Sequence, residues 1–442
     1  MTKRLWLAVI GVALFAMPAR AQDPPHNEAV RVEHLWSIFN DLYGPGGLVV
    51  DSEAALAGGQ SHSAHFNGGF ESEFSQFGIA LTSQLVSLPQ PAPAAGFTYQ
   101  FDPALGVFNR TTNNFGPIMS ERAETIGARR LSAGFATQRL EFDLIEGLDL
   151  SNIPAVFSHD NAQLLGGRED VITTVNSVEA AFTRSTLFLT YGVTNRFDVS
   201  VAIPWVTADM TVTSDATIRR IGTRIPEIHF FRSLQDNIGD RRIFTAFGSA
   251  SGIGDINLRA KATVKRTSRQ GFALGIDLRL PSGEELDLLG TGAPGVQPYA
   301  AWSASFGPFS PHVNTGYQWN GSSVLGGGPR LGESRDLPDL VRYSAGASIE
   351  LHPRVTLAAD VIGRWVLDSP RLTSQTFHAL DGVSTFPDIA FRKDSLNELS
   401  AATGVKVNIV NRLLLTGNLL FRLNSVGLVD KVSPLVGLEY AF

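Results

Sequence analysis

The feature that most constrains the fold of this chain is an alternation of apolar and polar residues with a period of two. Residues 197–205, 256–264, 341–351 and 355–365 all show it. In residues 272–280 the alternation runs Phe272, Ala273, Leu274, Gly275, Ile276, Asp277, Leu278, Arg279 and Leu280. Because successive side chains of a strand point to opposite faces, the pattern predicts strands with one apolar and one polar face.

Three further features favour a membrane barrel over a soluble β-sandwich, which can show the same period. The runs are roughly 10 to 13 residues long, the length of a tilted membrane strand. Tight connections alternate with long loops near 213–254, 282–295, 322–338 and 369–395, as periplasmic turns and outer loops do. The chain ends in alternating residues that include Tyr440 and Phe442, and this ending resembles the C-terminal barrel-assembly signal of outer-membrane barrels.

We therefore expect an all-β fold, a transmembrane antiparallel β-barrel. Twelve strands are expected near 130–142, 178–193, 196–212, 255–266, 271–281, 296–307, 311–321, 340–352, 355–368, 396–409, 412–424 and 432–442. Residues 78–88 and 97–108 could add two more and make fourteen. Closure is needed because an open sheet in lipid would leave edge N–H and C=O groups unpaired.

The beginning of the chain reads as an export signal. Residues 1–21 combine Lys3 and Arg4 with an apolar run of signal-peptide length and a small-residue cleavage site. Removing Lys3, Arg4 and Arg20 lowers the Lys and Arg count from 36 to 33 against 42 Asp and Glu, so the net charge changes from −6 to −9. This charge argues against nucleic acid as a partner. The chain has no cysteine, which excludes disulfides and thiolate metal sites.

Residues 22–77 differ in pattern from the barrel region 78–442. Residues 27–43 show helical spacing, and the glycines and proline of 44–47 end the helix. Leu35, Trp36 and Phe39 on this helix are candidates for a plug inside the barrel. The alternative is a helix that packs against the wall or caps the mouth.

If the apolar faces contact lipid, the polar faces line the lumen. The candidate lumen-lining residues are Asp198, Arg259, Lys261, Asp277, Arg279, Arg342, Glu350, Asp360, Arg364, Lys406, Arg412 and Arg422. They either brace the interior by cross-strand pairing or orient a permeant. Apolar residues Phe188, Ile362, Leu414 and Leu420 share the inward parity. These four residues form either a track for hydrophobic molecules or a core beneath a plug.

Other motifs do not support an enzyme or a cofactor site. Residues 290–295 match G-x-G-x-x-G, but Pro294 and Pro298 preclude the helix that a dinucleotide site requires. His62 and His65 lie in a Gly/Ser-rich segment without a nearby acidic ligand. His312 is expected to point inward, but no serine-containing constellation is visible around it in the sequence. We expect no catalytic, cofactor or metal residue.

Three segments resemble an outer-membrane family named for the meta-pathway of phenol degradation. They are Phe115-Gly116-Pro117-Ile118-Met119-Ser120-Glu121-Arg122, residues 252–261, and residues 280–285 followed by 288–292. The resemblance covers roughly residues 78–442 and implies passage of aromatic or other hydrophobic compounds. This family is in turn distantly similar to the long-chain fatty-acid transporters, barrels with an N-terminal hatch.

We therefore expect a bacterial outer-membrane channel for passive uptake of small hydrophobic or aromatic compounds. A structural or surface-interaction barrel is the first alternative, and a barrel hydrolase is the second. The expected partners are membrane lipid, lipopolysaccharide, the barrel-assembly machinery and a small hydrophobic permeant. Basic residues in 213–254 could contact lipopolysaccharide phosphates. The sequence does not name the permeant or the oligomeric state.

Overall fold

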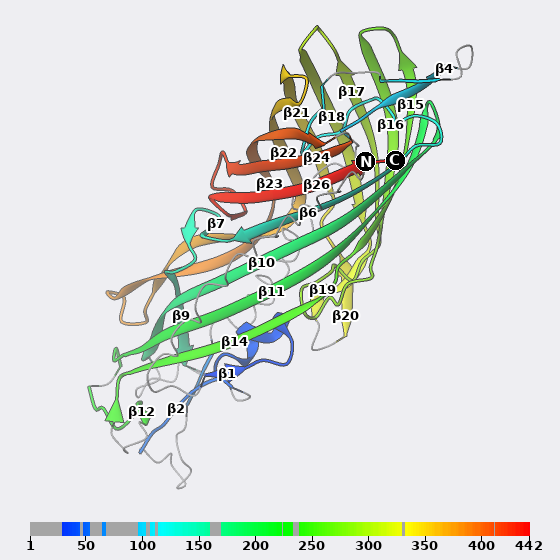
Figure 1. Cartoon of the computed structure of the whole chain (residues 1–442). Coiled ribbons are helices and arrows are strands. Elements are labelled where there is room, and N and C mark those ends of the chain that lie inside the picture. Colours follow the sequence, from blue (N-terminus) through cyan, green and yellow to red (C-terminus); the bar gives the residue numbers. More distant parts are fainter. Residues whose placement is uncertain are drawn as a thin grey trace, which may run out of the picture.

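A computed structural model of the chain forms a closed antiparallel β-barrel (Figure 1). The structure describes residues 29–44, 47–53, 64–67, 96–102, 107–110, 114–159, 169–222, 224–232, 238–328, 332–410 and 412–442. The expected signal segment 1–21 lies outside these residues. No helix within the described ranges is long and apolar enough to span a membrane.

The wall has twelve strands, counting β14 and β15 as one interrupted strand, and this confirms the lower of the two predicted numbers. Its strands are β6 (Leu131–Glu141), β10 (Val171–Thr194), β11 (Phe197–Arg219), β14 (Arg241–Ile253) with β15 (Ile256–Arg266), β16 (Gln270–Leu280), β17 (Gly295–Ala304), β18 (Phe309–Asn320), β21 (Leu340–His352), β22 (Val355–His378), β23 (Thr385–Val410), β24 (Leu413–Arg422) and β26 (Val432–Ala441). Each pairs with the next, and β26 closes the sheet on β6, with Leu435 opposite Gln138.

The lipid-facing belt follows from the alternation. Val199, Leu274 and Leu278 are among the exposed apolar side chains of the outer face. Trp205, Trp319 and Trp365 are about half exposed at 53%, 52% and 49% and lie towards the end with long connections. Tyr191, Phe309, Tyr440 and Phe442 are exposed at the end with short turns. An apolar band flanked by aromatic residues at both ends is the outer surface of a membrane barrel.

Five strands extend beyond this belt, and on β11 the two faces exchange polarity there. On β11, the outward residues after Trp205 are polar and include Thr207, Asp209 and Thr211, whereas the inward Ala208, Met210 and Val212 are fully buried. The same strands β10, β11, β14, β22 and β23 project furthest in Figure 1. In this part of the barrel the outer surface is therefore polar and solvated, and the inner surface is apolar.

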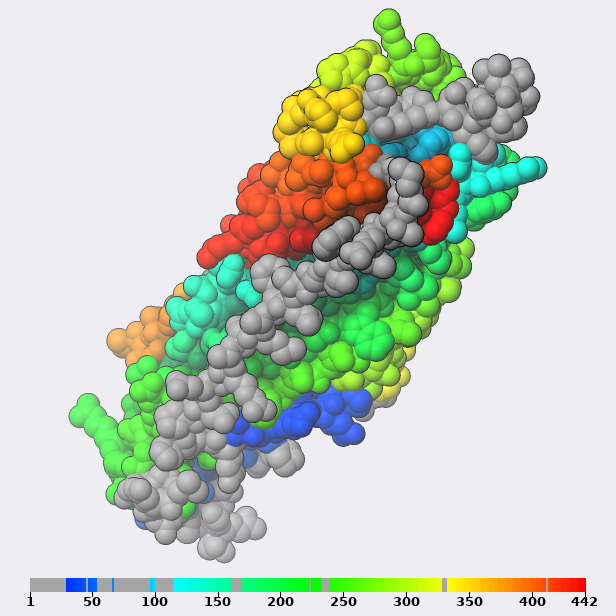
Figure 2. Space-filling model, viewed as in Figure 1, coloured from blue at the N-terminus to red at the C-terminus, as the bar shows by residue number. Residues whose placement is uncertain are grey.

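The N-terminal residues cover that apolar inside, which we call the outer core. β1 (Val30–Arg31) adds to β14 in parallel, with Val30 opposite Ala246, and Figure 2 shows these residues in blue beside the green strands. The 3₁₀ helix η1 (Leu35–Ser37) and the helix α1 (Ile38–Asp41) follow. Leu35, Ile38 and Phe39 join inward residues of β11 and the extended tips of β22 and β23 in one buried cluster.

Short elements complete the outer end. β2 (Leu48–Val50) pairs with β3 (Ala64–Asn67), β3 with β9 (Ile153–His159), and β9 with β10. The remaining pieces are β7 (Leu144–Ile145), β8 (Leu148–Asp149) and β25 (Leu428–Val429) in one small sheet, β12 (Phe231–Arg232) with β13 (Ile238–Gly239), and β19 (Ser322–Gly328) with β20 (Glu333–Asp336).

Three sequence expectations need correction. The predicted loops 213–254 and 369–395 are largely strand, because β11, β14, β22 and β23 continue outward beyond the membrane belt. The described helix spans only η1 and α1, since Val30–Arg31 is recruited as a strand by the open edge of β14. Among the described strands, β4 (Tyr99–Asp102) and β5 (Val107–Arg110) pair with each other and not with the wall, so they are not the predicted additional wall strand near 97–108. The segment 78–88 lies outside the described residues.

The exchange of faces along β11 predicts opposite tolerance of charge at two positions on its outer side. Val201, opposite Leu189, lies between the aromatic levels of Tyr191 and Trp205. Val201→Arg places a charge in the lipid belt and should destabilise the folded barrel by about 2–4 kcal/mol, whereas Thr211→Arg, beyond the belt, should cost about 0–1 kcal/mol. Urea unfolding in lipid vesicles, followed by heat-modifiable gel migration, measures both. Equal costs at the two positions would show that the belt is misplaced.

Candidate permeation pathway

The lumen is crossed by an irregular segment, residues 114–128, which we call the inner plug. It has no helix or strand, yet nearly all its residues are buried, including Phe115, Ile118 and Ile126. A buried irregular backbone needs partners for its N–H and C=O groups. Side chains that point inward from the barrel wall supply them.

Polar wall residues hold the first half of the inner plug. Phe115 N donates to Thr356 Oγ1 at 3.1 Å, and the ammonium of Lys406 donates to the carbonyl oxygens of Phe115 at 3.2 Å and Pro117 at 2.6 Å. Ser120 Oγ donates to Asp360 Oδ1 at 2.7 Å and lies 2.9 Å from Ser344 Oγ. Four wall residues, Thr356, Lys406, Asp360 and Ser344, thus fix the plug at Phe115, Pro117 and Ser120.

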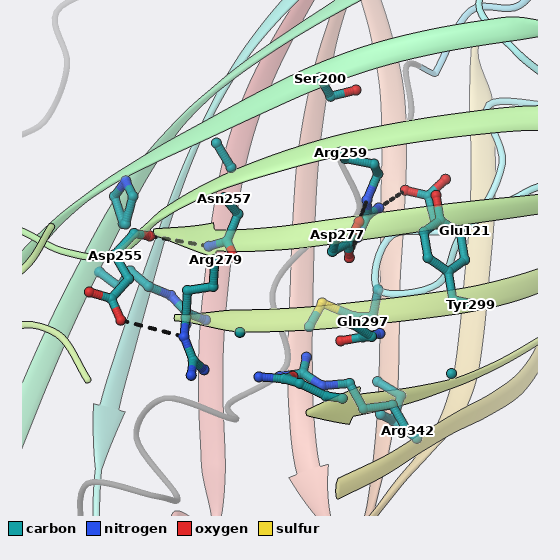
Figure 3. Close-up of a pocket in the computed structure, with 18 of the residues that line it drawn as sticks. Glu121, Ser200, Asp255, Asn257, Arg259, Asp277, Arg279, Gln297, Tyr299 and Arg342 are labelled. Carbon is teal, nitrogen blue, oxygen red and sulfur yellow. Dashed lines mark hydrogen bonds and ion pairs between the residues drawn. The ribbon is translucent and has the colours of Figure 1, made fainter. Parts of the chain in front are cut away.

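An ion-pair network holds the centre of the inner plug. Glu121 accepts from Arg259 and, at 3.1 Å, from Lys261, while Arg259 also forms a two-pronged pair with Asp277 (Figure 3). Lys261 donates further to the carbonyl oxygens of Arg122 and Glu124. Burial on its own raises the pKa of the Glu121 carboxyl, but the charges of Lys261 and Arg259 outweigh it and hold that pKa below its ordinary value.

The last part of the inner plug is tied to the short-turn end. Ala123 N donates to Ser303 Oγ at 3.0 Å, and Ile126 N donates to Asp198 Oδ2 at 2.9 Å. Thr125 and Ala128 bond to Asn195 in the β10–β11 turn. Glu121 N also donates to Asn314 Oδ1 of β18 at 2.6 Å. The plug therefore contacts β11, β15, β17, β18, β21, β22 and β23 of the wall.

Apolar inward residues pack beneath the plug. Ile118 and Met119 cluster with Phe188, Ile362 and Leu420, and Phe115 clusters with Leu414. The sequence left open whether these inward apolar residues form a track or a core beneath a plug. In the structure Leu414 and Leu420 pack against a plug, although this plug is residues 114–128 and not residues 27–43. Phe188 and Ile362 pack there too, but they also line a cavity.

A cavity of about 220 Å³ lies between the inner plug and the loop 281–294. Met119 and Glu121 of the plug form part of its lining, and Leu288 and Leu289 of the loop form another part. Phe182, Phe188, Val206 and Ile362 give it apolar walls, and its charged lining residues are Glu121, Arg184, Asp255, Arg259, Asp277, Arg279 and Arg342. The ring of Tyr299 lies over Gly275, where any side chain would collide with it.

The predicted lumen-lining residues fall into four groups. Asp198, Arg259, Lys261, Asp360 and Lys406 contact the inner plug, and Arg259, Asp277, Arg279 and Arg342 line the cavity. Arg364 and Arg422 both pair with Glu398, away from that lining. Glu350 and Arg412 are half-buried near the short turns and touch neither plug nor cavity among the described contacts. Tyr440 and Phe442 stack edge to face on the outer surface, with ring centroids 4.8 Å apart.

The plug candidates of the sequence occupy a different place. Leu35 and Phe39 are buried in the outer core, and Trp36 packs against it. Trp36 N donates to the carbonyl of Leu286, so this segment meets the outer side of the loop that closes the cavity. Its position is that of a cap at the mouth. The segment that crosses the lumen had no periodic signal, and only the motif 115–122 marked it.

His312 does not belong to a hydrolytic arrangement. Its Nε2 lies 2.5 Å from Asp360 Oδ1, and Ser120 donates to that same oxygen. A nucleophilic serine would need the histidine as its base, with the carboxylate behind the histidine. Here the carboxylate stands between the two, and all three side chains are buried against the plug.

The basic residues of 213–254 are partly neutralised within the structure. Arg220 pairs with Asp240, and Arg241 pairs with Asp215. Arg232 and Arg242 lie over the rings of Phe230 and Phe244. Contact with lipopolysaccharide remains a prediction.

The closed barrel, its lipid-facing belt and its short-turn end define an outer-membrane β-barrel protein. The family model described as "Putative MetA-pathway of phenol degradation" matches residues 161–361, which confirms the resemblance found in the sequence. No curated protein matches the chain.

Solved structures with a similar fold include an outer-membrane channel from Pseudomonas putida F1, at 13% identity over 73% of this chain and 99% of that chain, with a TM-score of 0.44. The CymD monoaromatic hydrocarbon channel shares 10% identity over 71% and 88%, with a TM-score of 0.33. A FadL homologue from Pseudomonas aeruginosa shares 9% identity over 71% and 89%, with a TM-score of 0.30.

The ion pairs of Glu121 predict that acid loosens the inner plug. Because the folded-state pKa is lowered from 4.5, the pairs contribute fully above that pH and are lost as the pH falls through the lowered value. Single-channel conductance in planar bilayers should stay constant from about pH 8 to about pH 5 and rise towards about pH 3. In Glu121→Gln this rise should be absent; an identical profile in both proteins would contradict the role of Glu121.

Proposed function

We propose that this protein is a passive outer-membrane channel for small hydrophobic or aromatic molecules. The observation that carries the proposal is the partly apolar cavity between the loop 281–294 and the inner plug. A site of about 150 Å³ lined by apolar side chains is large enough for benzene, so about 220 Å³ accommodates a substituted aromatic ring. The family description, which concerns phenol degradation, supports an aromatic permeant.

In this mechanism the permeant enters from the outside, rests in the cavity and leaves past the inner plug. The apolar walls from Phe182, Phe188 and Ile362 replace water around the permeant. Release requires the plug to shift, because residues 114–128 fill the lumen towards the periplasmic end. The plug is held by hydrogen bonds and ion pairs to side chains rather than by strand pairing, so it can move without opening the wall.

A reversible cross-link tests whether the plug must move. The chain has no native cysteine, and Ser120 Oγ of the plug lies 2.9 Å from Ser344 Oγ of β21. A disulfide in Ser120→Cys/Ser344→Cys should abolish protein-dependent uptake of labelled benzyl alcohol by whole cells, and a reductant should restore it. Heat-modifiable migration checks that the barrel folds.

The matched control is a cross-link that leaves the plug free. Thr137 Oγ1 and Ser185 Oγ lie 3.0 Å apart on the outer face of the neighbouring strands β6 and β10. Thr137→Cys/Ser185→Cys should transport equally when oxidised and reduced. Protein-dependent uptake that persists through the oxidised plug cross-link would show that the plug need not move. Uptake that never exceeds that of cells lacking the protein would instead favour a structural barrel.

A further inference from the structure

One arginine in the cavity forms no ion pair with any of the described residues. The three acidic residues of the lining are all engaged: Glu121 and Asp277 by Arg259, and Asp255 by Arg279 at 3.7 Å and by Thr291 at 2.6 Å. In Figure 3 dashed lines reach Arg259 and Arg279 but not Arg342. Within the described part of the chain, no carboxylate lies within ion-pair distance of Arg342, and its buried Nε has no hydrogen-bond partner.

The neighbouring wall residues raise the free-energy cost of burying the charge of Arg342. Its cross-strand partners are Gly316 on β18 and Arg364 on β22. Like charges directly opposite each other destabilise a sheet. Arg364 pairs with Glu398, which Arg422 also contacts. Arg342 itself has a like charge opposite it and no carboxylate within ion-pair distance among the described residues, at a place where burial of a lone charge is unfavourable.

The surroundings suit a ligand with two chemically different parts. Arg184 also lines the cavity and donates to Gln138 Oε1 at 2.9 Å, so a second guanidinium borders the same space. Phe188 and Ile362 supply apolar surface in the same cavity. A guanidinium fork binds a carboxylate with two parallel hydrogen bonds, while the apolar walls receive a ring or short hydrocarbon.

We propose that Arg342 is an anion-binding residue and that the permeants of this cavity are small carboxylates with an apolar body. This inference rests on the proposed function only where it calls the bound molecule a permeant. Binding of a carboxylate at Arg342 does not depend on transport. Neutral aromatic molecules would bind the same walls more weakly, because they leave Arg342 unpaired.

Binding of benzoate and of benzamide, its neutral counterpart of similar shape, tests the proposal on purified full-length protein in detergent. Isothermal titration calorimetry should show that the wild type binds benzoate at least about tenfold more tightly than benzamide, as expected for a charge-assisted pair. Arg342→Gln should lose this preference, and Arg342→Lys should keep part of it. Arg342→Met serves if the glutamine variant fails to fold.

The control is Arg335→Gln, whose side chain is 71% exposed on β20, outside the cavity; its benzoate affinity should equal that of the wild type. Equal affinities for benzoate and benzamide in the wild type would overturn the proposal, and so would unchanged benzoate binding in a folded Arg342 variant. If benzoate binding depends on Arg342 while uptake never exceeds that of cells lacking the protein, the anion site stands and the channel function fails.

Discussion

The whole structure depends on pairing backbone hydrogen-bonding groups where water is absent. In lipid each unpaired N–H or C=O costs several kcal/mol, so the sheet must close on itself. β26 closes on β6, and the wall keeps its bonds even where β14 gives way to β15, because Gly254 N donates to Pro204 O at 2.8 Å. Beyond the belt, the free edge of β14 is paired with β1, so the N-terminal segment serves the same requirement.

The same constraint explains why the interior is charged. The inner plug has no regular secondary structure of its own, and its amides and carbonyls are bonded by wall side chains such as Thr356, Asn314 and Lys406. Several inward polar residues are therefore partners for a backbone rather than a coating for water. Arg342 stands apart from them, because it contacts neither a carboxylate nor the plug among the described interactions. A binding role is best supported for a charged residue that neither forms an ion pair within the fold nor holds the plug.

The sequence predicted the membrane part of the barrel well and the rest poorly, for physical reasons. Lipid on one side and a polar lumen on the other impose strict alternation, so strands such as 271–281 were placed within one or two residues. The outward halves of β22 and β23 have no lipid to face, and residues 369–395 therefore looked like a loop. The inner plug has no period at all, since each residue meets a different wall side chain. The helical spacing of residues 27–43 instead made that segment the candidate plug.

The exchange of polarity along β11 also bears on how the barrel avoids misregistration. If β11 slipped by one residue against β10, Asp198 and Ser200 would be turned to the acyl chains, and Met210 and Val212 would be turned to water. The two errors have the same sign, so the penalties add rather than cancel. The register of β11 is thus specified twice, by lipid within the membrane and by water beyond it. Its extra length outside the membrane helps to align the part inside.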